Sequence, residues 1–89
     1  MLYLVDEPMT EIASRTIAAD PDPVVVLIQD GVLLDPTAVL SADRVGDVPV
    51  YAVRKDVAVR GVDLPATVEP VGYPGLVELL FEREVRSFA

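Results

Sequence analysis

The chain has 89 residues, enough for one small domain, and 52% of them are apolar. Its 15 acidic and 7 basic side chains give a net charge of −8, and the basic residues do not cluster. Direct binding to nucleic acid or to an anionic membrane is therefore not expected, since both need clustered Lys and Arg. We expect basic or apolar protein partners instead. The absence of Cys and His removes disulfides, thiolate ligands and the commonest general base.

No apolar run approaches the ~20 residues that cross a bilayer, and the N-terminal residues lack a basic segment typical of signal peptides. We therefore expect one domain over residues 1–89, located in the cytoplasm. A chain this short hides only roughly 60–65% of its extended surface on folding. The apolar surplus has two explanations, which the sequence leaves open. It is either a Val-rich core with scattered exposed side chains, or a surface that another chain covers.

The first third of the chain predicts two strands separated by a helix. Residues 2–5 form a short apolar run that predicts a strand. Apolar and small side chains then recur at helical spacing over residues 9–17, with Pro8 in a first-turn position. Two prolines predict a turn over residues 20–23. The unbroken apolar run 24–28 predicts a strand covered on both faces, as in a parallel sheet.

The middle of the chain is more polar and predicts turns around one further helix. Residues 29–31 end the second strand, and residues 32–34 are expected to form one turn. Asp35 followed by Pro36 is typical of a helix start, so a helix is expected through about Leu40. A polar loop is expected over residues 43–49.

Two further strands flank a short helix. Residues 50–53 predict the third strand, and residues 55–60 predict a helix that Gly61 ends in a left-handed conformation. Residues 67–71 predict a fourth strand. Its Pro70 cannot donate to a neighbouring strand, so this strand is expected at an edge of the sheet.

The last predicted helix begins at Tyr73-Pro74, and Glu82 is expected to pair with Arg86 at helical spacing. Its apolar stripe is expected to consist of Leu76, Val77, Leu80 and Phe81. Residues 85–88 predict either a fraying turn or a short fifth strand. The alternation of strands and helices predicts an α/β fold, with a mainly parallel sheet of four or five strands and helices on both faces.

Three segments occur in an order and spacing that match a known family. They are VLIQDGV at 26–32, PVYAV at 49–53 with Asp56 and AVRG at 58–61, and YPGLVEL at 73–79 with Phe88 near the end. Together they resemble the DsrH/TusB family of sulfur-relay proteins. The resemblance covers nearly the whole chain and implies a small Rossmann-like fold of the DsrE-like superfamily.

The resemblance also implies partners: DsrE/TusD-like and DsrF/TusC-like subunits that relay persulfide sulfur toward 2-thiouridine at the tRNA wobble position or serve sulfur oxidation. In the family, the sulfur-carrying Cys lies chiefly on the DsrE/TusD-like partner. Some DsrH-type members carry another Cys near the first helix, where this chain offers only Ser14 and Thr16. A hydroxyl cannot form a persulfide. The resemblance therefore implies a non-catalytic, structural subunit, and the alternative is a stand-alone homo-oligomeric binding module.

Polar residues at predicted strand ends are the candidates for chemistry. Gln29 and Asp30 follow a buried strand, where open α/β sheets place ligands, and would face a partner's sulfur site. We favour a structural role, in which Asp30 caps the next turn and Gly31 adopts a positive φ. Asp6 and Glu7 could join Asp30 around Mg²⁺, but a solvated acidic rim is the better interpretation.

No catalytic, cofactor-binding or metal-ligating residue is predicted. Ser14 has no neighbouring base motif. Tyr51 and Tyr73 are expected either in the core or, more so for Tyr73, at an interface between subunits. Leu33 and Leu34 lie in a polar turn and are expected to be exposed contacts. The interface candidates are Gln29, Asp30, Leu33, Leu34 and Tyr73.

Overall fold

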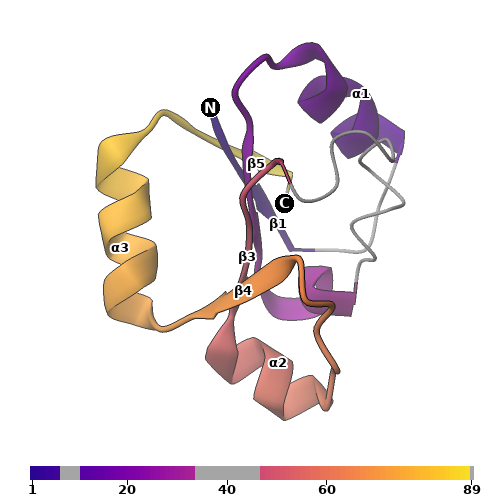
Figure 1. The fold of residues 1–89 in the computed structure, drawn as a ribbon, viewed down its shortest axis with the longest axis vertical. Coiled ribbons are helices and arrows are strands. Elements are labelled where there is room, and N and C mark those ends of the chain that lie inside the picture. The colour runs from indigo at the N-terminus through magenta and orange to yellow at the C-terminus, as the bar shows by residue number, and fades with distance from the viewer. Residues whose placement is uncertain (7–10, 34–46, 89) are drawn as a thin grey trace.

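The computed structural model describes residues 1–6, 11–33 and 47–88, and their centre is a five-stranded, all-parallel sheet (Figure 1). The strand order is β4-β3-β2-β1-β5. The strands are β1 (Leu2–Val5), β2 (Val24–Leu27), β3 (Val50–Val53), β4 (Val68–Val71) and β5 (Val85–Phe88). The helices are α1 (Glu11–Ala19), α2 (Arg54–Arg60), α3 (Tyr73–Glu82) and the 3₁₀ helix η1 (Gln29–Leu33). The predicted α/β class and parallel sheet are confirmed.

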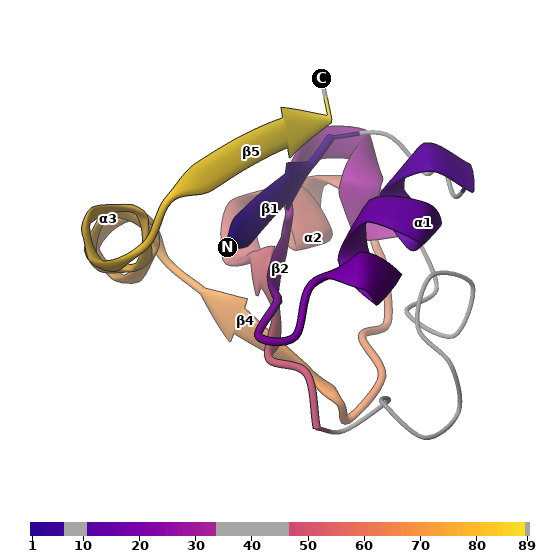
Figure 2. The same cartoon turned by 90° about the horizontal axis from the view of Figure 1, so that it is seen from above.

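The strand order fixes which face each helix covers. From β1 to β4 the chain advances one strand at a time in one direction, and from β4 it returns to place β5 beside β1. Because parallel crossovers are right-handed, the return connection lies on the opposite face of the sheet from the others. Figure 2 shows this arrangement, with α3 on one side of the sheet and α1 on the other.

Each face of the sheet has its own apolar cluster. On the α1 face, Tyr3, Val25, Val50 and Val68 line up across four strands, and Ile17 of α1 covers them. On the opposite face, the buried side chains are Leu2, Val24 and Val26, with partly buried leucines of α3 packed against them. All four residues of β2 are buried. The prediction of a strand covered on both faces is therefore confirmed for β2.

Several local predictions are also confirmed. Gly61 ends α2 with a φ of 61°, in the left-handed region that its lack of a Cβ allows. The strand that contains Pro70 lies at an edge of the sheet, where its missing N–H costs no hydrogen bond to a neighbouring strand. Residues 85–88, for which two alternatives were open, form β5 and pair with β1.

Two predictions about α3 are wrong. Val77 and Phe81 were expected to pack with Leu76 and Leu80, but both are exposed, and Leu79 joins the two leucines against the sheet. The helix ends at Glu82, so Arg86 belongs to β5 and the helical spacing between them does not exist.

In the middle of the chain, the 3₁₀ helix begins at Gln29, three residues earlier than the expected turn. The helix expected from Asp35 to Leu40 lies outside the described residues. Within the described ranges, no helix has the length and apolar character needed to cross a bilayer.

Candidate interaction surface

The segment from Gln29 to Gly31 lies at the carboxyl end of β2, as predicted, but its backbone differs from the prediction. Gln29, not Gly31, has the positive φ, at 48°. A residue with a Cβ adopts this left-handed conformation at a cost of about 1 kcal/mol. The backbone N–H of Gln29 donates to Oδ2 of Asp56 in α2 at 2.9 Å, which offsets part of that cost.

Gly31 is required for a different reason: the backbone passes very close to the end of β1. A Cβ on Gly31 would lie 1.8 Å from the carbonyl oxygen of Val5, well inside any van der Waals contact. That same oxygen accepts a hydrogen bond of 2.9 Å from the N–H of Ile28. Gly31 therefore allows η1 to pack directly on the end of β1.

Asp30 makes its contact with α2. Its Oδ1 accepts a hydrogen bond of 2.8 Å from Nε of Arg60, whose guanidinium also lies 3.6 Å from Oδ1 of Asp56. The expected cap on the following turn is thus replaced by an ion pair between η1 and α2. The Asp30 side chain is 63% exposed, so the pair contributes little to stability, on the order of 0–1 kcal/mol. These polar groups hold η1 to α2.

A shallow apolar hollow of about 190 Å³ lies beside this segment, between η1, the loop after α2, and β4. Its described lining consists of Val, Leu and Pro residues together with Asp63. It is smaller than the roughly 300–1,000 Å³ of typical small-molecule sites. The described part of this lining offers no pair of groups for acid–base chemistry.

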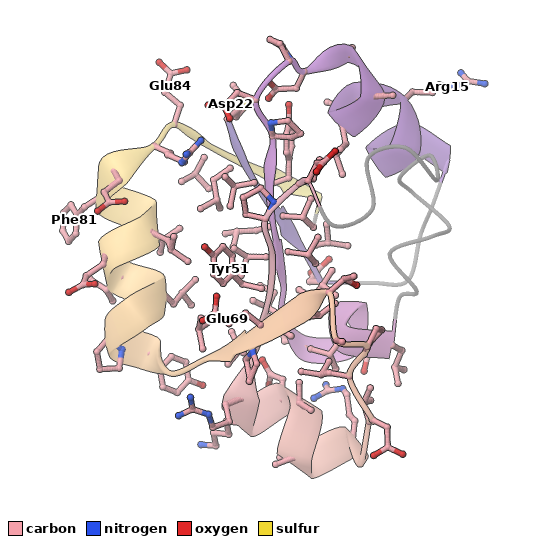
Figure 3. All side chains as sticks on the ribbon, in the orientation of Figure 1. Arg15, Asp22, Tyr51, Glu69, Phe81 and Glu84 are labelled. Atoms are coloured by element: carbon pink, nitrogen blue, oxygen red, sulfur yellow. The ribbon has the colours of Figure 1, made fainter. Side chains whose placement is uncertain are left out.

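Among the described residues, three exposed large apolar side chains lie on α3. Tyr73 is 55% exposed, Val77 47% and Phe81 88%, and they recur every four residues along one side of the helix. We refer to these three side chains as the outer stripe of α3. Figure 3 shows Phe81 pointing away from the sheet, whereas Tyr51 lies between α3 and the strands. No residue of α3 is buried, including the leucines that face the sheet.

The surroundings of Val77 and Phe81 in the outer stripe are acidic. Glu78 and Glu82 follow Val77 and Phe81 in sequence, and Glu84 lies just beyond the helix; all three are exposed. Arg83 donates to Oδ2 of Asp22 at 3.2 Å across to the loop before β2. Its charge is therefore partly neutralised where it lies.

Among the described residues, the strongest electrostatic perturbation lies at Asp20, away from both regions. The hydroxyl of Tyr3 donates to Oδ2 of Asp20 at 2.7 Å, and the N–H of Asp22 donates to Oδ1 at 2.9 Å. These two hydrogen bonds, with a smaller contribution from the terminal ammonium 3.2 Å away, lower the pKa of Asp20 from 3.8 to about 2. Asp20 is ionised at neutral pH and ties the end of α1 to β1.

The remaining residues predicted as site candidates have three outcomes: some are exposed, Asp30 is held in an ion pair, and some lie outside the described residues. Gln29 and Leu33 are exposed, with Leu33 at 54%, whereas Leu34 and Glu7 lie outside the described residues. Asp30 is held in an ion pair by Arg60. Among residues 1–6, 11–33 and 47–88, no three carboxylates are close enough to hold a metal ion.

A family model for the DsrH-like proteins matches residues 8–85 of the chain, which is most of its length. This chain belongs to the DsrH-like family. The match includes the Gln29–Gly31 segment, α2 and all of α3. Family membership indicates a subunit of a sulfur-relay system. No curated protein matched the chain.

For this DsrH-like chain, two exposed residues were missed as interface candidates. Val77 and Phe81 were assigned to the core because apolar residues at helical spacing are most often buried. The signal that could have identified them is the number of apolar residues in α3. Six of its ten side chains are large and apolar, more than one face of a surface helix can bury.

Proposed function

We propose that this DsrH-like protein is a non-catalytic structural subunit of a sulfur-relay complex of the TusBCD or DsrEFH type. It would form a single domain over residues 1–89 in the cytoplasm. It would support persulfide transfer on partner subunits, either for 2-thiouridine formation at the tRNA wobble position or for sulfur oxidation.

The observation that carries this proposal is chemical. A relay passes sulfur as a persulfide, which requires a thiolate, and this chain contains no Cys at any of its 89 positions. A member of a sulfur-relay family without a thiol contributes by contact and shape. The sulfur carrier would be a Cys of a DsrE-like partner.

The arrangement of the polar residues supports the same conclusion. The groups at the carboxyl end of β2, where an α/β sheet would bind a ligand, are engaged in holding η1 to α2. Three of the exposed large apolar side chains of the described residues lie together on α3, away from these groups. Apolar residues left on the surface of a small domain are typical of a protein that binds another protein.

A deletion strain tests the role in the relay. We expect loss of the gene to lower 2-thiouridine in bulk tRNA, measured by mass spectrometry of nucleosides, or to lower the rate of sulfur oxidation. The wild-type gene supplied in trans should restore the defect. Full thiolation together with full sulfur oxidation in the deletion strain would contradict the proposal.

Co-purification separates this function from the alternative of a homo-oligomeric binding module. The tagged protein, expressed with the DsrE-like and DsrF-like proteins of its source organism, should elute with both in one peak of defined mass. A stable homo-oligomer that excludes both proteins would favour the alternative instead.

A further inference from the structure

We propose that the outer stripe of α3 docks into an apolar groove on a partner subunit, and that the rim of this groove carries Arg or Lys. The proposal rests on the proposed function, because it assumes that the protein works inside an assembly. It adds which surface makes the contact and what chemistry the partner presents.

The first step is that the outer stripe is not needed for folding. Leu76, Leu79 and Leu80 already provide the apolar contacts of α3 with the sheet. At about 100° per residue, these leucines and the outer stripe together cover an arc of about 200° of the helix. A helix that only covered its own sheet would need about half of that arc to be apolar.

The second step is the geometry of the stripe. Tyr73, Val77 and Phe81 lie four residues apart, so at 1.5 Å per residue they span about 12 Å along one side of α3. This spacing is the pattern by which an amphipathic helix enters an apolar groove. An aromatic side chain stands at each end, and aromatic residues dominate the binding energy of many interfaces.

The third step is the charge around the stripe, which determines the kind of partner. Glu78 and Glu82 lie on the flank of the helix next to Val77 and Phe81, and Glu84 follows at its end. Of the described cations near α3, Arg83 at its C-terminal end is paired with Asp22. Arg54 lies at the opposite end, where its Nη1 is 3.8 Å from the Cβ position of Gly72. A partner that covers the stripe must therefore accommodate exposed carboxylates, which favours basic residues around its groove.

The same charges argue against a second copy of this chain as the occupant. Each copy carries a net charge of −8. Two outer stripes packed together would bring their acidic flanks into proximity, and like charges across an interface are unfavourable. The surface therefore fits a different, more basic protein.

A pair of matched substitutions tests the contact. Phe81→Glu places a carboxylate in the stripe, whereas Val59→Glu makes the same charge change on α2, where Val59 is 72% exposed. Each variant is expressed with the DsrE-like and DsrF-like proteins, and affinity is measured by titration of the purified components. We expect Phe81→Glu to weaken binding at least tenfold and Val59→Glu to bind as the wild type does. Circular dichroism melting verifies that both variants fold.

A second pair tests the charge of the partner. We expect the double variant Glu78→Lys with Glu82→Lys to weaken binding at least tenfold, and the loss to shrink as salt is raised. Asp47→Lys with Asp63→Lys makes the same net change at exposed positions away from α3 and should leave binding intact.

The outcomes separate the two proposals. If the wild type binds the DsrE-like and DsrF-like proteins and Phe81→Glu binds equally well, the docking surface is wrong while the proposed function stands. If the wild type binds neither, both proposals fall. A wild-type homodimer that Phe81→Glu dissociates would make a second copy the occupant and overturn the inference of a basic partner.

Discussion

Leu80 and Phe81 are neighbours in α3 but lie in opposite environments. Leu80 packs against the cluster formed by Leu2, Val24 and Val26, whereas Phe81 is 88% exposed on the other side of the helix. Phe81, the larger of these two apolar side chains, therefore contributes less to the core than Leu80 does. This difference separates the part of α3 that stabilises the fold from the part available to a partner.

Alanine substitutions should reveal this separation in the isolated chain. We expect Leu80→Ala to lower the free energy of unfolding by about 2 kcal/mol, because it removes part of the contact between α3 and the sheet. Phe81→Ala should change it by less than about 0.5 kcal/mol. Urea unfolding followed by circular dichroism measures both. Equal losses for the two variants would mean that Phe81 is buried in solution.

Gly31 and Gly75 provide a second matched pair. Gly31→Ala would place a Cβ 1.8 Å from the Val5 carbonyl oxygen, and since that neighbour is backbone, η1 or β1 must shift. We expect a loss of about 3 kcal/mol or more in the free energy of unfolding. Gly75→Ala, in α3, would meet the Val71 Cβ at an ordinary 3.8 Å and should gain up to about 1 kcal/mol from helix propensity. A Gly31→Ala variant as stable as the wild type would contradict the close approach.

Continuous apolar runs made most of the sheet predictable from sequence. The unbroken run from Val24 to Ile28 indicated burial on both faces, and Pro70 indicated an edge strand; both features are present. The order of the strands was not predictable, because it depends on which strand β5 pairs with after the chain turns back from β4. Only pairing with β1 shows that residues 85–88 are a strand.

The candidate surface was harder to predict, because two apolar stripes overlap on one helix. A helical repeat is formed equally well by the predicted stripe of Leu76, Val77, Leu80 and Phe81. The residues that face the sheet are Leu76, Leu79 and Leu80, and only the position of the sheet decides between the two sets. At the carboxyl end of β2, the positive φ was expected at Gly31 because glycine adopts it most easily. The nearby Val5 carbonyl, distant in sequence, determines the role of Gly31 instead.

Gln29 allows a test that separates its backbone from its side chain. Its φ of 48° is unfavourable for a β-branched residue, so Gln29→Val should lower the free energy of unfolding by about 1–2 kcal/mol. Gln29→Gly should be within about 1 kcal/mol of the wild type, because relief of strain opposes the greater entropy of the unfolded chain. Thermal melting compares the two. A Gln29→Val variant that melts with the wild type would exclude the left-handed conformation.

The hydrogen bond from Tyr3 to Asp20 predicts how stability depends on pH. The pKa of Asp20 is about 2 in the folded protein and 3.8 without its partners, so the folded state favours the ionised carboxylate. This contribution is fully present above pH 3.8 and is lost as the pH falls toward 2.

Tyr3→Phe removes the largest cause of the pKa shift of Asp20, and we expect it to lower the free energy of unfolding by about 1.5 kcal/mol at pH 7. The difference in the free energy of unfolding between variant and wild type should then narrow between pH 4 and pH 2, because protonation of Asp20 weakens in the wild type the interaction that the variant already lacks. Urea unfolding at stepped pH measures this gap, with Tyr73→Phe on α3 as the control for loss of an exposed hydroxyl. A gap that stays constant down to pH 2 would mean that Asp20 is not the group that Tyr3 stabilises.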